Sequence, residues 1–233
     1  MCGRFASILP PEALRRLFGT TNLPPDAVPR YNVAPGQPVM VVRFNPRAGG
    51  RSLDLLRWGL VPHWAKDAAR GATLINARGE TLADKPAFRQ AFASRRCIIP
   101  ADAFYEWQAG PRPKQPFAIR PTGDRPFALA GLWENWQQPD GQWMRTCTIV
   151  TTTSNPTMAA LHHRMPVILD PLDVSAWLGE VPAGPADLQA LLRPCQDDRM
   201  IAIPVGTGVN DVRRDDPSLL DPVAPDKDEG RLL

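Results

Sequence analysis

Proline is the residue that most limits how this chain can fold. The sequence has 27 prolines among 233 residues, where an average protein has about 5% proline. Each proline fixes its own φ angle and removes one backbone hydrogen-bond donor, so it interrupts helices and central strands. We therefore expect many short elements joined by turns.

Hydrophobic periodicity and turn residues indicate where these short elements lie. A short amphipathic helix with proline at its start is predicted at 10–18, and a β-hairpin at 38–44 and 51–58, on either side of NPRAGG. Strands and helices do not alternate regularly, so the sequence predicts an α+β fold with a mainly antiparallel core. Further strands are predicted at 96–100, 116–120, 126–133 and 142–152, a broken helix at 82–92, and short helices at 155–162 and 171–178.

Composition is that of an ordinary globular protein, with 43% hydrophobic and 22% charged residues. The length favours one compact domain, and we expect a monomer. The net charge of +3 permits a polyanionic partner if the arginines cluster. The sequence shows no export signal and no apolar run of about 18 residues, which predicts a cytoplasmic protein without a membrane segment. The domain is expected to span 1–216, and the Asp-, Pro- and Lys-rich stretch 217–233 is predicted to be a disordered tail.

The cysteines do not have the spacing of a metal site. Cys2, Cys97, Cys147 and Cys195 lie far apart, without a CxxC pair, and do not combine with the three histidines into a zinc motif. We expect no metal and no cofactor. In a reducing compartment Cys2 stays a free thiol.

The opening residues MCGRFA place a cysteine directly after the initiator methionine. Removal of Met1 gives Cys2 an α-amine, with a pKa near ~8, next to its thiol. Such a 1,2-aminothiol condenses with an aldehyde: the amine forms an imine, and the thiol then closes a five-membered thiazolidine. The alternative is that Cys2 is an ordinary small residue at a frayed terminus.

Three polar clusters supply groups for such chemistry. INARGE (75–80) contains Asn76, AFYEWQ (103–108) contains Glu106 between two aromatic residues, and LHHRMPVIL (161–169) contains His162 and His163. A carboxylic acid and an imidazole can move protons near neutral pH, and an amide can orient a nucleophile. Each also has a structural interpretation: Asn76 as a turn cap, Glu106 as a solvated strand residue, and His162 as a core histidine.

Arginines and tryptophans add a second kind of group. Arg4, Arg78 and Arg164 have the fork geometry that binds phosphate. Trp64 and Trp107 offer flat rings on which bases can stack, although tryptophan is more often a core residue. Together they are what a groove for single-stranded nucleic acid requires.

Seven motifs follow one another along the chain: MCGRFA, RYNVAPGQPV (30–39), RWGLVPHWAKD (57–67), LINARGET (74–81), KPAFRQAF (85–92), RRCIIPADAFYEW (95–107) and LHHRMPVIL. Their order resembles the SOS response-associated peptidase (SRAP) family, whose members sense abasic DNA. The similarity runs from the first residue to about 170 and then weakens, and VGTGVNDVRRDDP (205–217) is only partly similar. His163 stands where the family pattern LHxRMP has a variable residue.

This resemblance implies one domain with a barrel-like β core. It also implies binding of single-stranded DNA and single-strand/double-strand junctions, and a thiazolidine cross-link between Cys2 and the ring-opened abasic sugar. In this chain Asn76 would position the amine of Cys2, while Glu106 and His162 would handle protons. The implied DNA contacts are Arg4, Arg78 and Arg164 at phosphates, and Pro35, Trp107 and Trp64 as wedge and stacking groups.

Two other functions remain open from the residues alone. One is an N-terminal-nucleophile peptidase or amidohydrolase, in which the Cys2 thiol attacks an amide and its own amine serves as base. The other is a non-covalent binder of modified single-stranded DNA. Only the cross-linking function requires an adduct with abasic DNA that resists denaturant.

Overall fold

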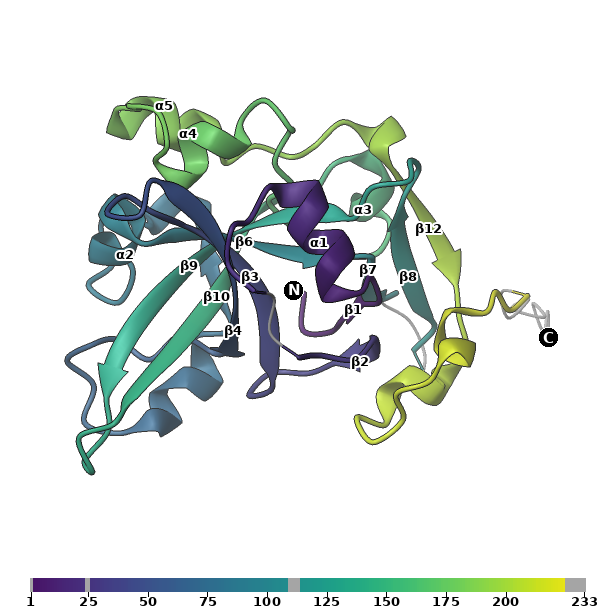
Figure 1. Ribbon diagram of the computed structural model, residues 1–233. Helices are drawn as coiled ribbons and strands as arrows, with labels where there is room; N and C mark the ends of the chain where they lie inside the picture. Colours follow the sequence, from purple (N-terminus) through teal and green to yellow (C-terminus); the bar gives the residue numbers. More distant parts are fainter. Residues whose placement is uncertain (1, 24–25, 109–113, 225–233) are drawn as a thin grey trace.

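The computed structural model describes residues 2–23, 26–108 and 114–224. Five strands close a barrel, because β10 pairs with β4, β4 with β3, β3 with β6, β6 with β9, and β9 again with β10. A second sheet has the order β12-β8-β7-β1-β2. Figure 1 shows the two sheets side by side, with helices on the outside. The strands are β1 (Phe5–Ser7), β2 (Arg30–Val33), β3 (Pro38–Asn45), β4 (Gly50–Trp58), β5 (Asn76–Arg78), β6 (Arg96–Ala101), β7 (Ala103–Trp107), β8 (Pro116–Pro121), β9 (Phe127–Gln137), β10 (Trp143–Thr153), β11 (Arg164–Pro166) and β12 (Met200–Pro204).

The helices are short, as the prolines predict. The first, α1, begins with Pro11 in its first turn and ends at Gly19, whose φ of 64° is left-handed and suits glycine. The helical segments are α1 (Pro11–Phe18), α2 (Arg89–Ser94), α3 (Pro156–Ala159), α4 (Val174–Leu178), α5 (Pro185–Ala190), and the 3₁₀ turns η1 (Ala68–Thr73), η2 (Gly79–Thr81), η3 (Asp197–Arg199), η4 (Thr207–Asn210) and η5 (Pro217–Leu220).

Three cores hold these elements together. The first lies where barrel strands face the second sheet and includes Cys2, Trp58 and Phe104. The opposite face of the barrel strands packs against α1, α2, α4 and α5 in a second core. The third lies on the other face of the second sheet, where Ala6 and Tyr105 pack against the C-terminal segment, residues 205–224. Cys2 is thus completely buried in the core between the sheets.

The predicted α+β class with a mainly antiparallel, barrel-like core is confirmed. Among the strands of the described residues, only β10 makes parallel ladders, with β4 and β5. The predicted hairpin is β3–β4, and the predicted strands at 96–100, 116–120, 126–133 and 142–152 are β6, β8, β9 and β10. The helices expected at 155–162 and 171–178 are shorter, as α3 and α4, and 82–92 contains only the start of α2. Within the described ranges no helix has the length and apolarity needed to cross a membrane.

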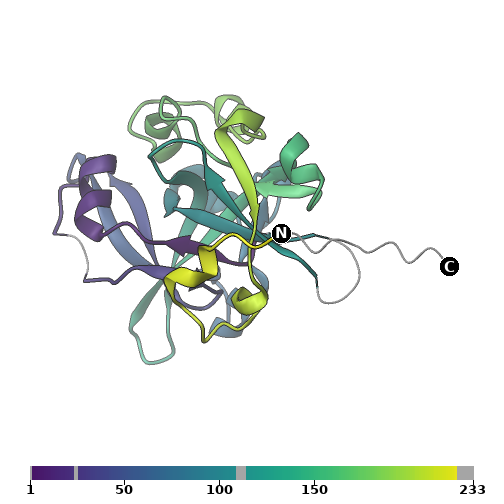
Figure 2. The same ribbon diagram turned by 90° about the vertical axis from the view of Figure 1, so that its right-hand side faces the viewer.

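The residues that follow the expected domain boundary at 216 pack onto the domain. Asp216 caps η5 by accepting from Ser218 N, and Leu219 and Leu220 are buried. Val223 N donates to Pro204 O at 2.9 Å. Two leucines give this segment enough apolar surface to pack, although its overall composition is polar. In Figure 2 the segment, in yellow, crosses in front of β1. The remainder of the predicted tail, 225–233, lies outside the described residues.

Candidate functional site

The Cys2 backbone is held by the side chain of Asn76. The Nδ2 group of Asn76 donates to the Cys2 carbonyl at 2.8 Å. Asn76 opens β5, which pairs in parallel with Ile149–Thr151 of β10. Successive side chains in a strand point to opposite faces, and Ala77 lies in the helix-covered core, so Asn76 and Arg78 face the other way, and Asn76 reaches Cys2. The structure therefore brings Asn76 and Cys2, both predicted site residues, into contact.

The oxygen of the Asn76 amide can still accept a hydrogen bond. This Oδ1 atom is buried and has no hydrogen-bond partner in the described part of the chain. A buried acceptor without a donor destabilises the fold unless another group donates a hydrogen bond to it. An N–H donor close to the Cys2 carbonyl, such as the α-amine of Cys2 after loss of Met1, would satisfy it.

Glu106 lies on the same side of the second sheet as Cys2. Along β7, Phe104 belongs to the core that contains Cys2, and Tyr105 to the core on the opposite face. Alternation along the strand therefore directs Glu106 toward Cys2. Glu106 is 3% exposed, so it is not a solvated strand residue. Burial raises the pKa of the Cys2 thiol, and the nearby Glu106 carboxylate raises it further. The thiol is therefore neutral at pH 7.

His162 completes the group of titratable residues. Its Nδ1 atom lies 3.0 Å from Arg164 N and 3.3 Å from Arg164 O, so the main chain of Arg164 offers this ring nitrogen both a donor and an acceptor. The exposed ring of His163 stacks on it at 4.3 Å. Burial lowers the pKa of His162, with a further lowering from the charged chain terminus and from His163, while the Glu106 carboxylate raises it. The charge of Glu106 thus raises the pKa of both Cys2 and His162.

Pro35 is exposed at the tip of the turn between β2 and β3. Gln37 N donates to Ala34 O, and Gly36 has a φ of 86°, which is a type II turn with proline and glycine at its two central positions. Gly36 N also donates to Trp58 O at 2.7 Å. The turn is therefore fixed to the end of β4, and Pro35 projects from a rigid support.

Trp64 is 48% exposed on the long connection between β4 and β5. Trp136 Nε1 donates to Ala65 O at 2.7 Å, and Val61 N donates to Thr146 Oγ1, so β9 and β10 anchor this connection. The Arg70 guanidinium lies over the Trp64 ring at 5.9 Å. An exposed ring beside a cation is suited to contact with a nucleic acid strand.

Arg4 and Trp107 lie apart from this group, beside the C-terminal segment. Arg4 Nη1 donates to Asn32 Oδ1 and to Val209 O, both at 2.8 Å. Trp107 follows Glu106 on β7 and packs against the third core, and its Nε1 donates to Asn210 Oδ1. Arg4 is therefore largely committed to internal contacts, and Trp107 points to the opposite face from Glu106.

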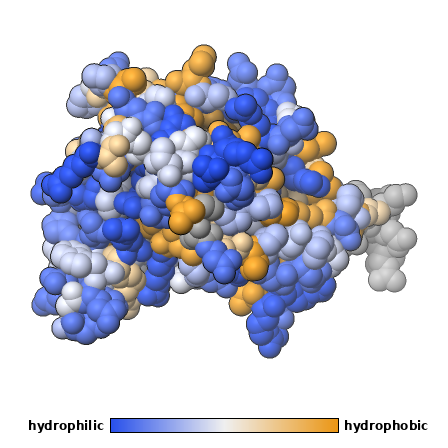
Figure 3. All heavy atoms as spheres, viewed as in Figure 1, coloured by the Kyte–Doolittle hydropathy of each residue, from blue (hydrophilic) through white to orange (hydrophobic). Residues whose placement is uncertain are grey.

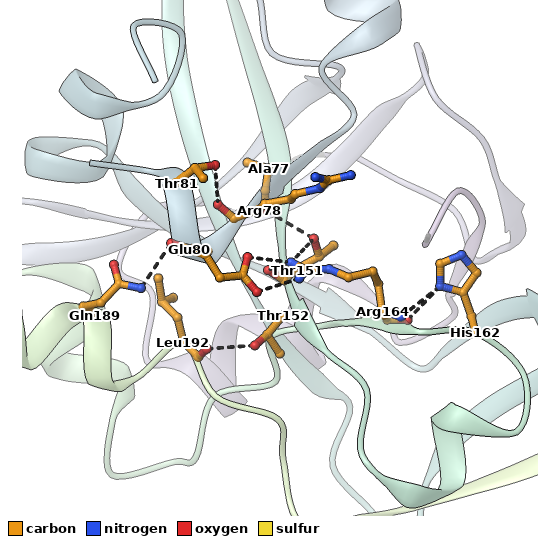
Figure 4. Close-up of polar contacts among 11 residues, drawn as sticks. Ala77, Arg78, Glu80, Thr81, Thr151, Thr152, His162, Arg164, Gln189 and Leu192 are labelled. Atoms are coloured by element: carbon orange, nitrogen blue, oxygen red, sulfur yellow. Dashed lines mark hydrogen bonds and ion pairs between the residues drawn. The ribbon is translucent and has the colours of Figure 1, made fainter. Parts of the chain in front are cut away.

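Arg164 differs from the exposed phosphate contact that the resemblance implies. Its side chain is 10% exposed, and Nη1 and Nη2 bind the two carboxylate oxygens of Glu80 at 2.5 and 2.9 Å. Nη2 also donates to Thr151 O at 2.7 Å. Arg78, in contrast, is exposed and has no carboxylate partner in the described ranges. Figure 4 shows the Arg78 side chain directed away from the Glu80–Arg164 pair.

Two residues that organise this region have no role in the sequence prediction. Glu80 occurs in INARGE, yet its partner is 84 residues away. Asn32 occurs in RYNVAPGQPV and is fully buried, with Nδ2 donating to Arg214 O at 2.7 Å and to Asp211 O at 3.0 Å. An asparagine within an apolar strand is the only sequence signal for such a contact. Among the described residues no group of three or more His, Cys, Asp or Glu side chains is arranged to hold a metal ion.

Comparisons with known proteins relate the whole chain to one family. The SOS response associated peptidase (SRAP) family matches residues 1–212. The abasic site processing protein YoqW of Bacillus subtilis is 42% identical over 224 residues, which cover 95% of this chain and 99% of YoqW. The abasic site processing protein HMCES of Gallus gallus is 31% identical over 265 residues, covering 96% of this chain and 78% of HMCES. A crystal structure from Bacteroides thetaiotaomicron has a TM-score of 0.85 at 22% identity, covering 96% of this chain and 100% of the other, and shares the fold.

Proposed function

The chain belongs to the SOS response-associated peptidase family, and from that premise we propose that it processes abasic sites in DNA by forming a covalent adduct through Cys2. Its relatives YoqW and HMCES are named abasic site processing proteins. The substrate is an abasic site in single-stranded DNA or at a single-strand/double-strand junction, reached in the cytoplasm. The adduct shields the lesion.

One observation carries this proposal. Asn76 holds the Cys2 carbonyl and keeps its own Oδ1 buried, without a partner in the described part of the chain. An amide in this position orients an α-amine on Cys2 because its oxygen accepts a hydrogen bond from the amine. This hydrogen bond directs the nitrogen lone pair outward. A peptide nitrogen at this place would have no nucleophilic lone pair, so the arrangement has a chemical use only after Met1 is lost.

The reaction proceeds in three steps. The closed abasic sugar opens when its ring oxygen gains a proton and its hydroxyl loses one, which frees the aldehyde. The Cys2 amine adds to the aldehyde carbon, and the resulting carbinolamine loses water to give an imine. The Cys2 sulfur then bonds to the imine carbon while the thiol proton passes to the nitrogen, and a thiazolidine forms. Glu106 and His162 serve as the acid and base pair for these proton transfers.

The state of the Cys2 thiol supports an amine-first reaction over a hydrolase. A thiol nucleophile that attacks an amide must first become a thiolate, and its burial together with the Glu106 carboxylate opposes that ionisation. In ring closure the imine nitrogen of the same residue takes up the thiol proton as the sulfur bonds to carbon, so no separate base has to generate a thiolate beforehand. The same argument weighs against a peptidase that acts on other proteins.

The DNA strand is proposed to pass over the exposed groups near Cys2. Arg78 binds a phosphate, Trp64 offers a ring for stacking, and Pro35 acts as a wedge at the lesion. The DNA contacts expected for Trp107 and Arg4 stay predictions, because both side chains are bound to the C-terminal segment. Hydrophilic residues cover most of the face in Figure 3, where hydrophobic residues form smaller groups.

Intact-mass analysis tests the proposal. Purified protein mixed with an abasic oligonucleotide should give a denaturant-resistant species with the mass of the protein lacking Met1, plus the oligonucleotide, minus one water. Cys2→Ala should abolish this product. An equal yield from Cys2→Ala would refute the mechanism, and binding without any adduct would favour the non-covalent alternative.

A further inference from the structure

Glu80 and Arg164 form an ion pair that links two parts of the candidate site. Glu80 lies on η2, directly after the strand that carries Asn76, and Arg164 opens β11, directly after the histidine pair. Both guanidinium Nη atoms bind the Glu80 carboxylate, and Nη2 also donates to Thr151 O on β10. Figure 4 shows the two side chains pointing toward one another beside Thr151, with His162 near the main chain of Arg164.

The main chain of Arg164 in turn determines the orientation of His162. Arg164 N lies 3.0 Å from His162 Nδ1 and Arg164 O lies 3.3 Å from it, so this stretch of main chain holds the Nδ1 edge of the ring in place. Arg164 is the first residue of β11, which is only three residues long and pairs with β10 at Thr151–Thr153. So short a ladder gives limited support. The ion pair of the Arg164 side chain is a second anchor for the same residue.

We propose that Glu80 is a positioning residue for His162, acting through Arg164. This inference rests on the proposed function, in which His162 moves protons during cross-linking. Glu80 fixes the Arg164 side chain, and the main chain of Arg164 then holds Nδ1 of the His162 ring. Arg164 serves this internal contact in place of a phosphate of the DNA.

Burial explains why a half-exposed carboxylate has this effect. The Arg164 side chain is 10% exposed and the Glu80 side chain 47%. A buried cation that loses its anion is left unpaired in a medium of low polarity, whereas an exposed pair loses little. Without Glu80, the hydrogen-bond acceptor left to the guanidinium among the described residues is Thr151. The charged group is then better solvated if it moves toward water. That movement draws residue 164 away from its place and releases Nδ1 of His162.

The test compares Glu80→Ala with Glu180→Ala. Glu180 also binds an arginine, Arg51, through both of its oxygens, but it belongs to the α4 region and not to the site. The rate constant of adduct formation is measured at saturating abasic single-stranded oligonucleotide. Affinity for the undamaged oligonucleotide and melting temperature are measured in parallel. Glu80→Gln, which keeps one acceptor oxygen, is the milder variant if Glu80→Ala folds poorly.

We expect Glu80→Ala to slow adduct formation roughly 10-fold, as a misplaced proton-transfer group does, with Glu80→Gln between it and the wild type. Affinity for undamaged DNA should stay the same, and Glu180→Ala should react at the wild-type rate. In a His162→Ala background, Glu80→Ala should change the rate by less than about twofold, because both substitutions act on the same group.

Other results would overturn the inference. A wild-type rate in Glu80→Ala, an equal loss in Glu180→Ala, or a full additional 10-fold loss in the His162→Ala background would each show that Glu80 does not act through His162. In all of these cases the wild-type adduct still forms, so the proposed function stands. Absence of an adduct from the wild-type protein would instead refute the proposed function itself.

Discussion

Substitution of Arg78 and of Arg164 tests how the protein contacts DNA, because these two arginines have different surroundings in the structure. Arg78 is exposed, without a carboxylate partner in the described part of the chain, whereas Arg164 is buried and bound to Glu80. Both were expected from the sequence to bind phosphate. The structure now predicts that Arg78→Ala removes one phosphate contact and that Arg164→Ala removes none.

The size of the effect follows from counterion release. Each phosphate contact on a single strand adds about 0.7 to the magnitude of the slope of log K against log salt concentration. A fourfold rise in salt, from about 50 to 200 mM, therefore weakens binding by a factor of about 2.6 for each contact. Over this range the affinity of the wild type should fall about 2.6 times more than that of Arg78→Ala.

Fluorescence anisotropy with a labelled, undamaged single-stranded oligonucleotide gives the required binding constants. Arg47→Ala is a suitable control, because Arg47 is an exposed arginine in the β3–β4 turn. We expect the slope for Arg47→Ala and for Arg164→Ala to equal that of the wild type. An unchanged slope for Arg78→Ala, or an equal flattening in all three variants, would refute the assignment of Arg78 as a specific phosphate contact.

The remaining predictions concern the reacting groups. Cys2→Ser keeps the amine and should give an imine that borohydride traps, without the stable adduct. Asn76→Ala loses one hydrogen bond worth about 0.5–1.5 kcal/mol and should slow adduct formation about 2- to 10-fold, measured at saturating DNA. Glu106→Gln and His162→Ala should each slow both formation and reversal by about 10- to 10⁴-fold, followed in time courses with a competing trap. Because the pKa of His162 is lowered in the folded state, the unfolding free energy should decrease as the pH falls below about 6.5, and His162→Gln should flatten that part of a urea-unfolding series.

Elements with local signals were predictable from the sequence, and the shortest elements were not. The β3–β4 hairpin has alternating apolar residues around a turn sequence, and α1 has proline at its start and glycine at its end. Neither β5 nor β11, each three residues long, has a pattern of its own. They exist because β10 offers a free edge with which they can pair, and pairing with a distant strand cannot be read from so short a stretch.

The chemical groups of the site were predicted more completely than their surroundings. Motif order supplied Cys2, Asn76, Glu106 and His162, and strand alternation explains why Glu106 faces inward. The Glu80–Arg164 pair could not be predicted, because any of the exposed acidic residues could have been the partner of an arginine 84 residues away. A motif gives the type of residue at a position, while its charge environment depends on the folded chain.

The C-terminal segment shows this dependence most clearly. None of the motifs that carry the family resemblance lies in it, yet Val209 O binds Arg4, two residues from Cys2, and Asn210 binds Trp107, the neighbour of Glu106. The buried Asn32 side chain binds three carbonyls of the same segment. Backbone carbonyls are available on any residue, so these contacts tolerate sequence change as long as the path of the main chain is kept. A nucleophile at the first strand can therefore be held in place by the last part of the fold without a recognisable motif there.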